Sequence, residues 1–489
     1  RYPGGSATMQ WIGLARDNDT TLGLIARDGR CFTKDFFAAA NEDGRSHTLE
    51  ARHYPENMGA TTSCQFPYEV ETVVLNGDWF ALAQHYRAWA TRQTWCEGGK
   101  NRRRRDTPEW FRKLIWWHHD GARDGAKLIE TFDRLQKAVP FPLAFHWYNW
   151  HSIPFDNFYP DYFPANDYVP AVRARLQKSG VRVMPYINGH LWDTQAKSYA
   201  EEGARRWAMK KPDGSLYIEH WNKHDHSTAC PFTDAWREKM VKVTDRLFRE
   251  IGVDAVYLDQ IGAAAAQLCY DESHGHPRGG GDHYVAGYWK ILAAVRENAR
   301  RLNPDAALTT EDTAEPFIGH LDGMLMCNRA HPDSIPFFPA VYHDHVAQFG
   351  LYMYEPEIKA GVTFRSKEAM LFHYGAQLGW HGTSWSEAPE HKAKFAWLTK
   401  LAAYRQLGLD WLAYGDMLRP PSVTMGDKKP VPRIPQRWTL HKTERETEQP
   451  AATTSAWQAG DGRIAVFVIN VSDQPLKVRV RLPAEAKNK

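Results

Sequence analysis

The sequence predicts an α/β protein: a (β/α)8 TIM barrel with flanking β-sandwich segments at both ends. Three observations predict this fold. The middle of the chain contains short apolar runs separated by segments of helix length, which is typical of parallel strands joined by crossover helices. There are eight such runs, the number that closes one barrel. Before and after this region, apolar and polar residues alternate around turn sequences, which indicates antiparallel strands.

The eight apolar runs are the expected barrel strands. In chain order they are KLIWWHHD (113–120), PLAFHWYNW (142–150), VRVMPYING (181–189), AVYLDQIG (255–262), AALTTEDT (306–313), GMLMCN (323–328), PAVYHDHV (339–346) and GAQLGWHG (375–382). The segments between them have helical spacing, as in DYVPAVRARLQKSG (167–180) and TDAWREKMVKVTDRLFREIG (233–252).

The flanking regions complete a division into four parts. QWIGLARDN and TTLGLIARDG form an expected hairpin across DNDT, YEVETVVLNGD is another strand, and DWFALAQHYRAWATRQ (78–93) has helical spacing. Glycine, charge and proline together in EGGKNRRRRDTPEW indicate a junction, and RPPSVTMGDKKPVPRIPQ (419–436) is typical of a connector. The predicted parts are a β-rich N-terminal domain at 1–96, a linker at 97–112, the barrel at 113–415 and a C-terminal β-sandwich at 416–489. Because strand-like patterning begins almost at once, we expect the N-terminal domain to be truncated.

Composition excludes several classes of protein. The 61 lysines and arginines nearly balance the 58 acidic residues, so a net charge of +3 gives no overall field for nucleic acid or a membrane. No apolar run approaches the roughly 20 residues that span a bilayer, and RYPGGSATMQ lacks the order of a signal peptide. The six cysteines have no zinc-ligand spacing, so we expect neither a structural zinc nor a cofactor, and disulfides stay open.

Acidic residues recur at the ends of the predicted strands. Strand four ends in Asp259 and strand five in Glu311, while strand seven carries Asp344 and strand one ends in Asp120. A carboxylate on an apolar strand is costly unless it is solvated or used. In a (β/α)8 barrel the carboxyl ends of all strands meet at one cleft. Each carboxylate alone could instead cap a helix or lie in a solvated turn, but together they indicate a site.

Two carboxylates that face one cleft are the groups that hydrolyse glycosidic bonds. One attacks the anomeric carbon, the other protonates the leaving oxygen and then activates water, and a separation of about 5 Å gives retention. Because neighbouring strands lie about 4.8 Å apart, we assign Asp259 as nucleophile and Glu311 as acid/base of a retaining glycoside hydrolase. Asp312 and Glu315, in the same turn, remain alternatives for the acid/base, and Asp344 is a further catalytic candidate.

Aromatic residues make up 13% of the chain, and flat rings stack on the apolar faces of sugars, although aromatics also fill large cores. The side chains expected to contact sugar lie at or just beyond strand ends: Asp120, Trp147, Tyr148, Trp150, Tyr186, Asn188, His190, Trp192, Trp221, Tyr257, His343 and Trp380. The loop CYDESHGHPRGGGDHY (269–284) follows strand four. Its glycines allow close approach to a ligand, and we expect Asp271, His274, His276 or Asp282 to bind sugar hydroxyls, unless the loop is an uninvolved surface segment.

The order of an Asp after strand four, a Glu after strand five and a His-Asp after strand seven resembles the α-amylase superfamily. That family usually has an arginine two positions before its nucleophile, where this chain has Tyr257. A group of bacterial glycoside-hydrolase-like proteins, the domain family DUF6259, is more similar in CPFTDAWREKM (230–240), GVDAVYLDQIG (252–262), CYDESHGHPRGGGDHY (269–284) and TTEDTAEPF (309–317). The related endo-α-N-acetylgalactosaminidases imply the same roles for Asp259 and Glu311. The resemblance also implies flanking sandwiches and α-linked glycans of α-galactosaminide, α-galactoside or α-glucoside type.

Two other functions remain open from the sequence. Histidines and acids cluster at HHD (118–120), HDH (224–226), SHGH (273–276) and HDH (343–345), as a metal-dependent barrel hydrolase would require, although strands four to six lack the usual histidines and lysine. A carbohydrate-binding barrel without catalysis would keep the aromatic cleft without needing both carboxylates. For the glycoside hydrolase and for the carbohydrate-binding barrel, the expected partner is an oligosaccharide or polysaccharide. Such a partner implies a secreted or periplasmic protein. The oligomeric state stays open.

Overall fold

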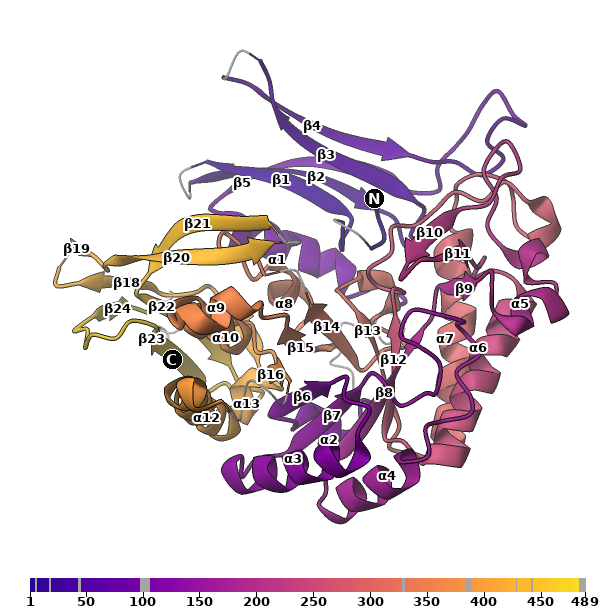
Figure 1. Cartoon of the computed structure of the whole chain (residues 1–489). Coiled ribbons are helices and arrows are strands. Elements are labelled where there is room, and N and C mark those ends of the chain that lie inside the picture. The colour runs from indigo at the N-terminus through magenta and orange to yellow at the C-terminus, as the bar shows by residue number, and fades with distance from the viewer. Residues whose placement is uncertain are drawn as a thin grey trace.

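The computed structural model of the chain describes residues 1–4, 7–16, 19–42, 45–96, 106–327, 330–382, 388–427, 429–440 and 443–482. A central barrel carries N-terminal sheets on one side and C-terminal sheets on another (Figure 1). No helix among these residues is long and apolar enough to cross a membrane. Most of the predicted linker, at 97–105, lies outside the described residues, and the rest leads into the short helix α2 (Glu109–Arg112).

Eight parallel strands form the barrel and confirm the predicted fold class. Their order in the sheet is β15-β14-β13-β12-β8-β7-β6-β16. The two ends of this sheet meet where Gln377 donates its backbone N–H to Gln348 (2.9 Å) and accepts one from Gly350 (3.2 Å). The strands are β6 (Trp116–Asp120), β7 (Leu143–Trp147), β8 (Arg182–Asn188), β12 (Ala255–Asp259), β13 (Ala307–Glu311), β14 (Gly323–Cys327), β15 (Ala347–Leu351) and β16 (Leu378–His381).

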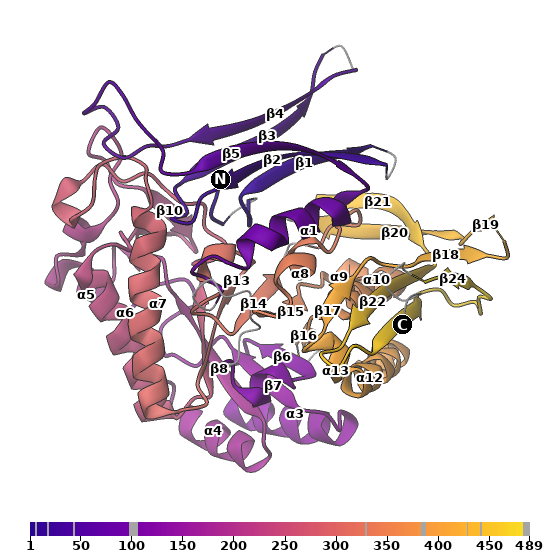
Figure 2. The same ribbon diagram turned by 180° about the vertical axis from the view of Figure 1, so that it is seen from behind.

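Helices pack around these strands, as crossover connections require. The predicted helix at 167–180 is α4 (Val169–Lys178), and the one at 233–252 is α6 (Asp234–Arg246), extended by one π turn to Ile251. The long helix α7 (His283–Leu302) comes after β12 and runs beside α6 (Figure 2). Other helices of the barrel region are α3 (Gly125–Ala138), α9 (Glu355–Ala360), α10 (Val362–His373), α12 (Lys392–Leu407) and α13 (Leu409–Leu412).

The seventh predicted strand is wrong. Residues 337–342 form the helix α8 (Phe337–Tyr342), and the strand is β15, which begins at Ala347. All six residues of α8 are buried, and a short, fully buried apolar run has no periodicity that separates a helix from a strand. The consequence is that His343 and Asp344 precede β15 and lie at its amino end, opposite the cleft.

A small insertion covers the carboxyl end of the barrel between β8 and β12. It contains the three-stranded sheet β10-β11-β9 and the helix α5 (Lys197–Glu201). Its strands are β9 (Leu191–Asp193), β10 (Ile218–Trp221) and β11 (His224–Thr228). The insertion brings side chains over the strand ends that the barrel alone would not supply.

The N-terminal region confirms the predicted hairpin and helix. β1 (Trp11–Arg16) pairs with β2 (Thr20–Arg27), and β2 pairs with β5 (Glu69–Asn76), all antiparallel. A separate pair is formed by β3 (Lys34–Ala40) and β4 (His47–His53). Helix α1 (Trp79–Ala90) lies between these strands and α8, and so joins the N-terminal region to the barrel (Figure 2).

The C-terminal region is antiparallel, as predicted, but its sheets begin inside the expected connector. Segment 419–436 contains β18 and β19 and the start of β20. Of its prolines, Pro430 and Pro435 lie in β19 and β20, which are edge strands and need fewer backbone donors. The others lie outside the strands. The strands are β17 (Asp416–Leu418), β18 (Ser422–Met425), β19 (Lys429–Pro430), β20 (Arg433–Leu440), β21 (Thr443–Pro450), β22 (Ala452–Gln458), β23 (Ile464–Asn470) and β24 (Arg479–Arg481).

Candidate active site

A cavity of about 260 Å³ opens at the carboxyl ends of β8, β12 and β13. Acidic and aromatic side chains from the barrel line it together with residues from the insertion and from the loop after β7. The lining residues are Tyr148, Phe155, Asp156, Tyr159, Tyr186, Asn188, Leu191, Trp221, His226, Tyr257, Asp259, Gln260 and Glu311. The volume is just below the roughly 300–1,000 Å³ of typical small-molecule sites, so it suits one sugar ring.

Asp259 ends β12 after four fully buried residues and is itself only half-buried. Three neighbours hold its carboxylate. Tyr186 donates its hydroxyl to Oδ2 at 2.8 Å, Tyr257 donates to Oδ1 at 3.1 Å, and Asn188 Nδ2 donates to Oδ2 at 3.3 Å. Tyr257 can reach it because residues two apart on a strand point to the same side. Burial raises the pKa of Asp259 to about 6, although the hydrogen bonds from Tyr186, Tyr257 and Glu311 oppose the rise.

The side chain of Asn188 is itself fixed by the start of the insertion. Its Oδ1 accepts the backbone N–H groups of His190 (2.9 Å) and Leu191 (2.8 Å). The amide NH2 group must therefore face the other way, toward Asp259 and toward Gln260 Oε1 at 2.8 Å. This arrangement gives Asp259 one rigid amide donor in addition to the two phenols.

Glu311 ends β13 as Asp259 ends β12, and it is also half-buried. The two strands pair in parallel with Leu258 opposite Thr310, so the carboxyl groups follow on neighbouring strands at the same level. The Glu311 carboxyl group lies close enough to that of Asp259 to help lower its pKa. The residues that follow each of them, Gln260 (φ 65°) and Asp312 (φ 53°), have left-handed backbones. Such strain outside glycine concentrates at functional sites.

A third carboxylate reaches the cavity from a loop. Asp156 lies between β7 and α4, and burial, together with the charge of Asp259, raises its pKa to about 7. Its backbone N–H donates to the hydroxyl of Tyr159 at 2.7 Å. At neutral pH this carboxyl group is therefore partly protonated and can donate a hydrogen bond.

Aromatic rings form most of the wall beside these acids. Tyr186 stacks with Tyr148 (centroids 4.9 Å apart) and with Tyr257 (5.8 Å apart), and Phe155 packs against Tyr186 at 5.1 Å. Trp221 stands at the edge of the cavity with 46% of its surface exposed. Its indole N–H donates to Glu219 at 2.9 Å. A ring of this kind gives an apolar platform at the entrance.

The profile of the family described as "Domain of unknown function (DUF6259)" matches residues 64–354, which is more than half of the chain. The chain belongs to this family.

The relatives of this DUF6259 chain are described as glycoside hydrolases. A "Putative glycoside hydrolase" of Bacteroides thetaiotaomicron is 30% identical over 98% of the chain and 69% of the relative. "Putative glycoside hydrolase 22789" of Monosiga brevicollis is 29% identical over 96% of the chain, which spans only 44% of that relative. The solved structure of an α-N-acetylgalactosaminidase from Bifidobacterium bifidum superposes with a TM-score of 0.67 at 12% identity, over 95% of this chain and 74% of that one, and this likeness shows the fold. The DUF6259 chain is thus glycoside hydrolase-like.

The structure brings seven of the residues singled out from the sequence into the cavity. They are Tyr148, Tyr186, Asn188, Trp221, Tyr257, Asp259 and Glu311. The cavity is also lined by six residues that were not predicted as sugar contacts: Phe155, Asp156, Tyr159, Leu191, His226 and Gln260. Phe155, Asp156 and Tyr159 belong to the loop after β7, where strand periodicity carries no information. Gln260 could have been predicted as a cavity residue, because it directly follows the strand-end carboxylate Asp259.

Several expected sugar contacts are core residues instead. Trp147, Trp150 and Trp192 are at most 2% exposed. Trp147 stacks on Phe145 and Trp150 donates to the carbonyl of Tyr186 (2.8 Å). His190 is also buried, with Nδ1 2.8 Å from the Tyr288 hydroxyl.

Asp120 and Trp380 lie at strand ends beside the cavity without lining it. Asp120 accepts the backbone N–H of Ala122 at 2.7 Å, which closes the turn after β6. Trp380 donates to His146 Nδ1 at 2.9 Å and stacks on His119, and it has a left-handed backbone (φ 77°).

The structure does not bring the other catalytic candidates to the cavity. Glu315 is fully buried and accepts the hydroxyls of Tyr86 and Tyr342. Burial raises its pKa to about 7. Asp344 forms an ion pair with Arg87 at 3.0 Å, and His343 lies within 3.0 Å of the carbonyls of Gly415 and Leu412. These contacts join the barrel to α1 and to the C-terminal region, at the amino end of β15.

The loop after β12 also lies away from the cavity. Asp271 pairs with Lys210, and Asp282 with Arg30 at 2.8 Å. His274 and His276 are 5% and 4% exposed and face two cysteines. None of these four residues, all of which the structure describes, lines the cavity. Their predicted role as sugar contacts is therefore not supported.

Proposed function

We propose that the chain is a retaining glycoside hydrolase that releases one α-linked sugar by double displacement, with Asp259 as nucleophile and Glu311 as acid/base. The observation that carries the proposal is the pair of carboxyl groups at the ends of the neighbouring strands β12 and β13, which both line the cavity. Retaining enzymes need their two carboxyl groups about 5 Å apart, whereas inverting enzymes need about 6.5–9.5 Å for a water between them. A pair on neighbouring strands supports the shorter arrangement.

In the first step, Asp259 attacks the anomeric carbon and Glu311 gives its proton to the leaving oxygen. The products are a β-linked glycosyl ester on Asp259 and the free alcohol. In the second step, Glu311 takes a proton from water, the hydroxide attacks the anomeric carbon, and the carboxylate of Asp259 departs. Two inversions give a product with the α configuration of the substrate.

The neighbours of Asp259 fit a nucleophile whose carboxyl group is largely ionised at neutral pH. Tyr186, Tyr257 and Asn188 donate hydrogen bonds to its carboxylate and so oppose the effect of burial. Because the pKa of about 6 lies below neutral pH, most Asp259 is ionised there. As the acid catalyst of the first step, Glu311 must be protonated when the substrate binds.

The substrate is proposed from the cavity and from the relatives. One sugar ring fits about 260 Å³, with Tyr148 and Phe155 on its apolar side and Asp156 as a donor to a hydroxyl. The α-N-acetylgalactosaminidase of similar fold supports an α-galactosaminide or α-galactoside, and an α-glucoside is the third candidate. Because such sugars occur mainly on glycans outside the cytoplasm, we propose that the protein is secreted or periplasmic, which cell fractionation would check.

A panel of aryl α- and β-glycosides of galactose, N-acetylgalactosamine and glucose tests the function. The proposal expects hydrolysis of one α-glycoside by the wild type and loss of about 10³-fold or more in Asp259→Asn. The matched control is Asp245→Asn, since Asp245 pairs with Arg249 and Arg301 and does not line the cavity. Sugar binding without hydrolysis, unchanged by Asp259→Asn, would support a carbohydrate-binding barrel instead. Activity that depends on an added transition metal and not on Asp259 would support a metal-dependent hydrolase.

A further inference from the structure

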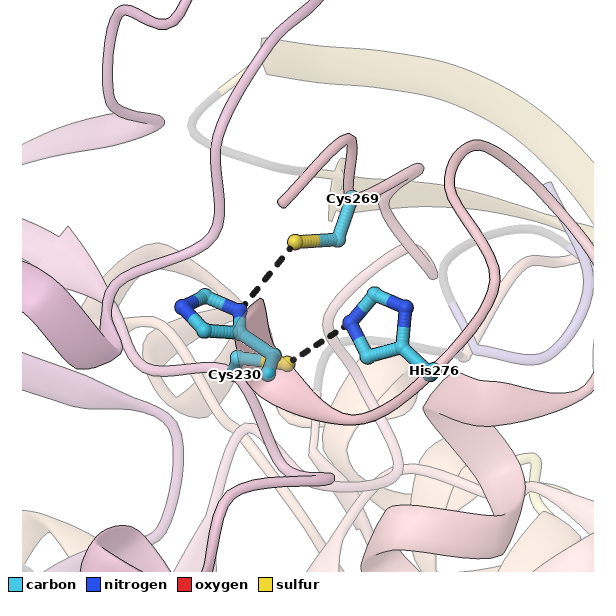
Figure 3. Close-up of side chains that lie close together, drawn as sticks. Cys230, Cys269 and His276 are labelled. Atoms are coloured by element: carbon cyan, nitrogen blue, oxygen red, sulfur yellow. Dashed lines mark hydrogen bonds between the residues drawn. The ribbon is translucent and has the colours of Figure 1, made fainter. Parts of the chain in front are cut away.

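Two cysteines and two histidines meet in a buried cluster beside the barrel. Cys230 follows β11, and Cys269, His274 and His276 belong to the loop after β12. Figure 3 shows Cys230, Cys269 and His276 around a common centre. The four ligand atoms all lie within 4.8 Å of one another. None of the four residues is more than 5% exposed, so solvent does not reach the centre freely.

The two imidazole rings are turned so that their lone pairs face the sulfur atoms. His274 Nε2 lies 2.8 Å from the carbonyl of Arg206, and His276 Nδ1 lies 2.8 Å from the carbonyl of Pro277. A carbonyl only accepts hydrogen bonds, so each of these nitrogens carries the hydrogen of a neutral ring. The other nitrogens are then free to bind a metal, and they point at Cys269 Sγ (3.4 Å) and Cys230 Sγ (3.5 Å). Carbonyl partners of this kind orient metal-binding histidines in many proteins.

We propose that Cys230, Cys269, His274 and His276 bind one zinc ion as a tetrahedral structural site. With Zn–S of about 2.3 Å and Zn–N of about 2.0–2.1 Å, tetrahedral ligand atoms lie about 3.3–3.8 Å apart. The two S···N distances of 3.4 and 3.5 Å fall in this range. In a two-iron cluster with two cysteines and two histidines, the cysteines and the histidines bind different irons, so sulfur and nitrogen would lie farther apart than they do here.

The ligand set also fits a dication. Zinc binds cysteine as thiolate, so two cysteines and two neutral histidines would balance the charge of one Zn²⁺. Four protein ligands leave no open position for water or substrate, so the site is structural and not catalytic.

The position of the cluster indicates what the ion stabilises. The same loop continues to Gly279, which bonds to Cys269, and to Gly281, which hydrogen-bonds to Thr33 and Tyr54 at the ends of β3 and β4. Gly279 and Cys269 exchange two backbone hydrogen bonds (2.7 and 3.1 Å). Gly280 N–H donates to Pro55 (3.0 Å), and a Cβ there would lie 2.3 Å from the carbonyl oxygen of Tyr54. The ion would thus hold the loop on which the N-terminal region is seated.

Cysteine spacing gave no sign of this site, because Cys230 comes from a separate segment; only the SHGH sequence (273–276) pointed to a metal. Cysteine spacing therefore predicted no metal site, whereas the fold brings two cysteines and two histidines together. Zinc would also explain why His274 and His276 are buried away from the cavity. The site is independent of the proposed hydrolase function.

Elemental analysis of the full chain, purified under reducing conditions without a chelator, tests the proposal. We expect about one zinc per chain in the wild type and in the control Cys64→Ser, whose cysteine is exposed and outside the cluster. Cys269→Ser and His276→Ala should lose most of it. Cobalt added to the metal-free wild type should give the strong visible d–d bands and sulfur-to-cobalt charge transfer of a tetrahedral site.

Measurements on the wild type keep the test decisive even if the variants do not fold. Removing the metal with a chelator should lower the melting temperature by several degrees, and adding zinc back should restore it. Absence of zinc together with no tetrahedral cobalt spectrum would overturn the proposal. A Cys230–Cys269 disulfide in the non-reduced, zinc-free protein, seen as a mass lower by two hydrogens and a cross-linked peptide, would overturn it as well.

Discussion

The hydroxyl of Tyr257 lies 3.1 Å from Oδ1 of Asp259, two positions along the same strand. Tyr186, on the neighbouring strand β8, donates to the other oxygen at 2.8 Å. Two neutral phenols therefore hold the carboxylate at a place where the α-amylase superfamily usually has an arginine. Neutral donors stabilise a carboxylate less than a cation does, which fits a pKa for Asp259 that stays raised at about 6.

Removing either phenol should move the acidic limb of the pH–activity profile. In the wild type, kcat/KM should rise with pH through about 6, because Asp259 must lose its proton to attack. A hydrogen bond to a charged group contributes about 1.5–3 kcal/mol, and about 1.4 kcal/mol corresponds to one pH unit. Tyr257→Phe and Tyr186→Phe should each raise the midpoint by about one pH unit or more.

The control for this prediction is Tyr148→Phe, which keeps the stacked ring and the hydrogen bonds from Tyr186 and Tyr257 to Asp259. Its acidic limb should match the wild type. If the Tyr257 and Tyr186 variants lose activity equally at every pH, the phenols do not act through the ionisation of Asp259.

Glu311→Gln should slow the hydrolysis of a substrate in proportion to how much its leaving group needs protonation. Natural glycosides, with alcohol leaving groups, should lose about 10²–10⁴-fold in kcat/KM. Aryl glycosides with acidic phenols need little protonation, so their first step should be nearly unaffected. Glu315→Gln, four positions later, makes the same chemical change on a buried side chain outside the cavity. Equal losses for both leaving groups, or a loss only in Glu315→Gln, would reject Glu311 as the acid.

Glu315→Gln should instead change the pH dependence of stability. Burial raises the pKa of Glu315 from 4.5 to about 7. The folded state holds this proton more tightly than the unfolded state, so its stabilising effect is complete below pH 4.5 and is lost as the pH rises through about 7. The difference corresponds to about 3 kcal/mol. Glutamine has no proton to lose.

Denaturant unfolding at about pH 5 and about pH 8 measures this effect. Relative to the wild type, the unfolding free energy of Glu315→Gln should increase between these two pH values by up to about 3 kcal/mol. Activity toward the best glycoside should remain within a few-fold. A parallel pH dependence in the two proteins would show that Glu315 is ionised in the folded state.

Trp221→Ala should weaken substrate binding more than it slows the reaction. The ring stands at the mouth of the cavity, 46% exposed, and can stack on a sugar at little cost. An aromatic contact of about 0.5–1.5 kcal/mol corresponds to a rise in KM of about two- to tenfold, with kcat unchanged. Tyr404→Ala, on the exposed side of α12, should change neither constant. A selective loss of kcat would assign Trp221 a role at the reacting centre.

The two central acids could be predicted because the local sequence and the fold give the same answer. Four apolar residues before Asp259 and before Glu311 indicate buried strands, and parallel strands bring their carboxyl ends to one level. Asp344 could not be placed this way, since the apolar run before it is a buried helix and a buried strand would have the same pattern. The prediction that the three core tryptophans contact sugar was wrong for a different reason. Trp147 points outward with Phe145, one position out of phase with Tyr148, which lines the cavity.

The remaining site residues depend on contacts that no local pattern shows. Asp156 reaches the cavity from the loop after β7, and Trp221 reaches it from an insertion between two strands. The Cys230–Cys269 cluster likewise joins two segments that are distant in the sequence. Loops and insertions are placed by tertiary packing, so the strand ends could be predicted from the sequence and the cover over them could not.

The measurement that tests the central claim most directly is covalent trapping of the nucleophile. The wild type is incubated with the 5-fluoro α-glycosyl fluoride of the sugar identified by the panel, digested, and its peptides are sequenced by mass spectrometry. The account predicts one fluoroglycosyl group per chain, as an ester on Asp259, and no labelling of Asp259→Asn. Labelling of another carboxylate, such as Asp156 or Glu311, or a product of inverted configuration from an unlabelled enzyme, would contradict it.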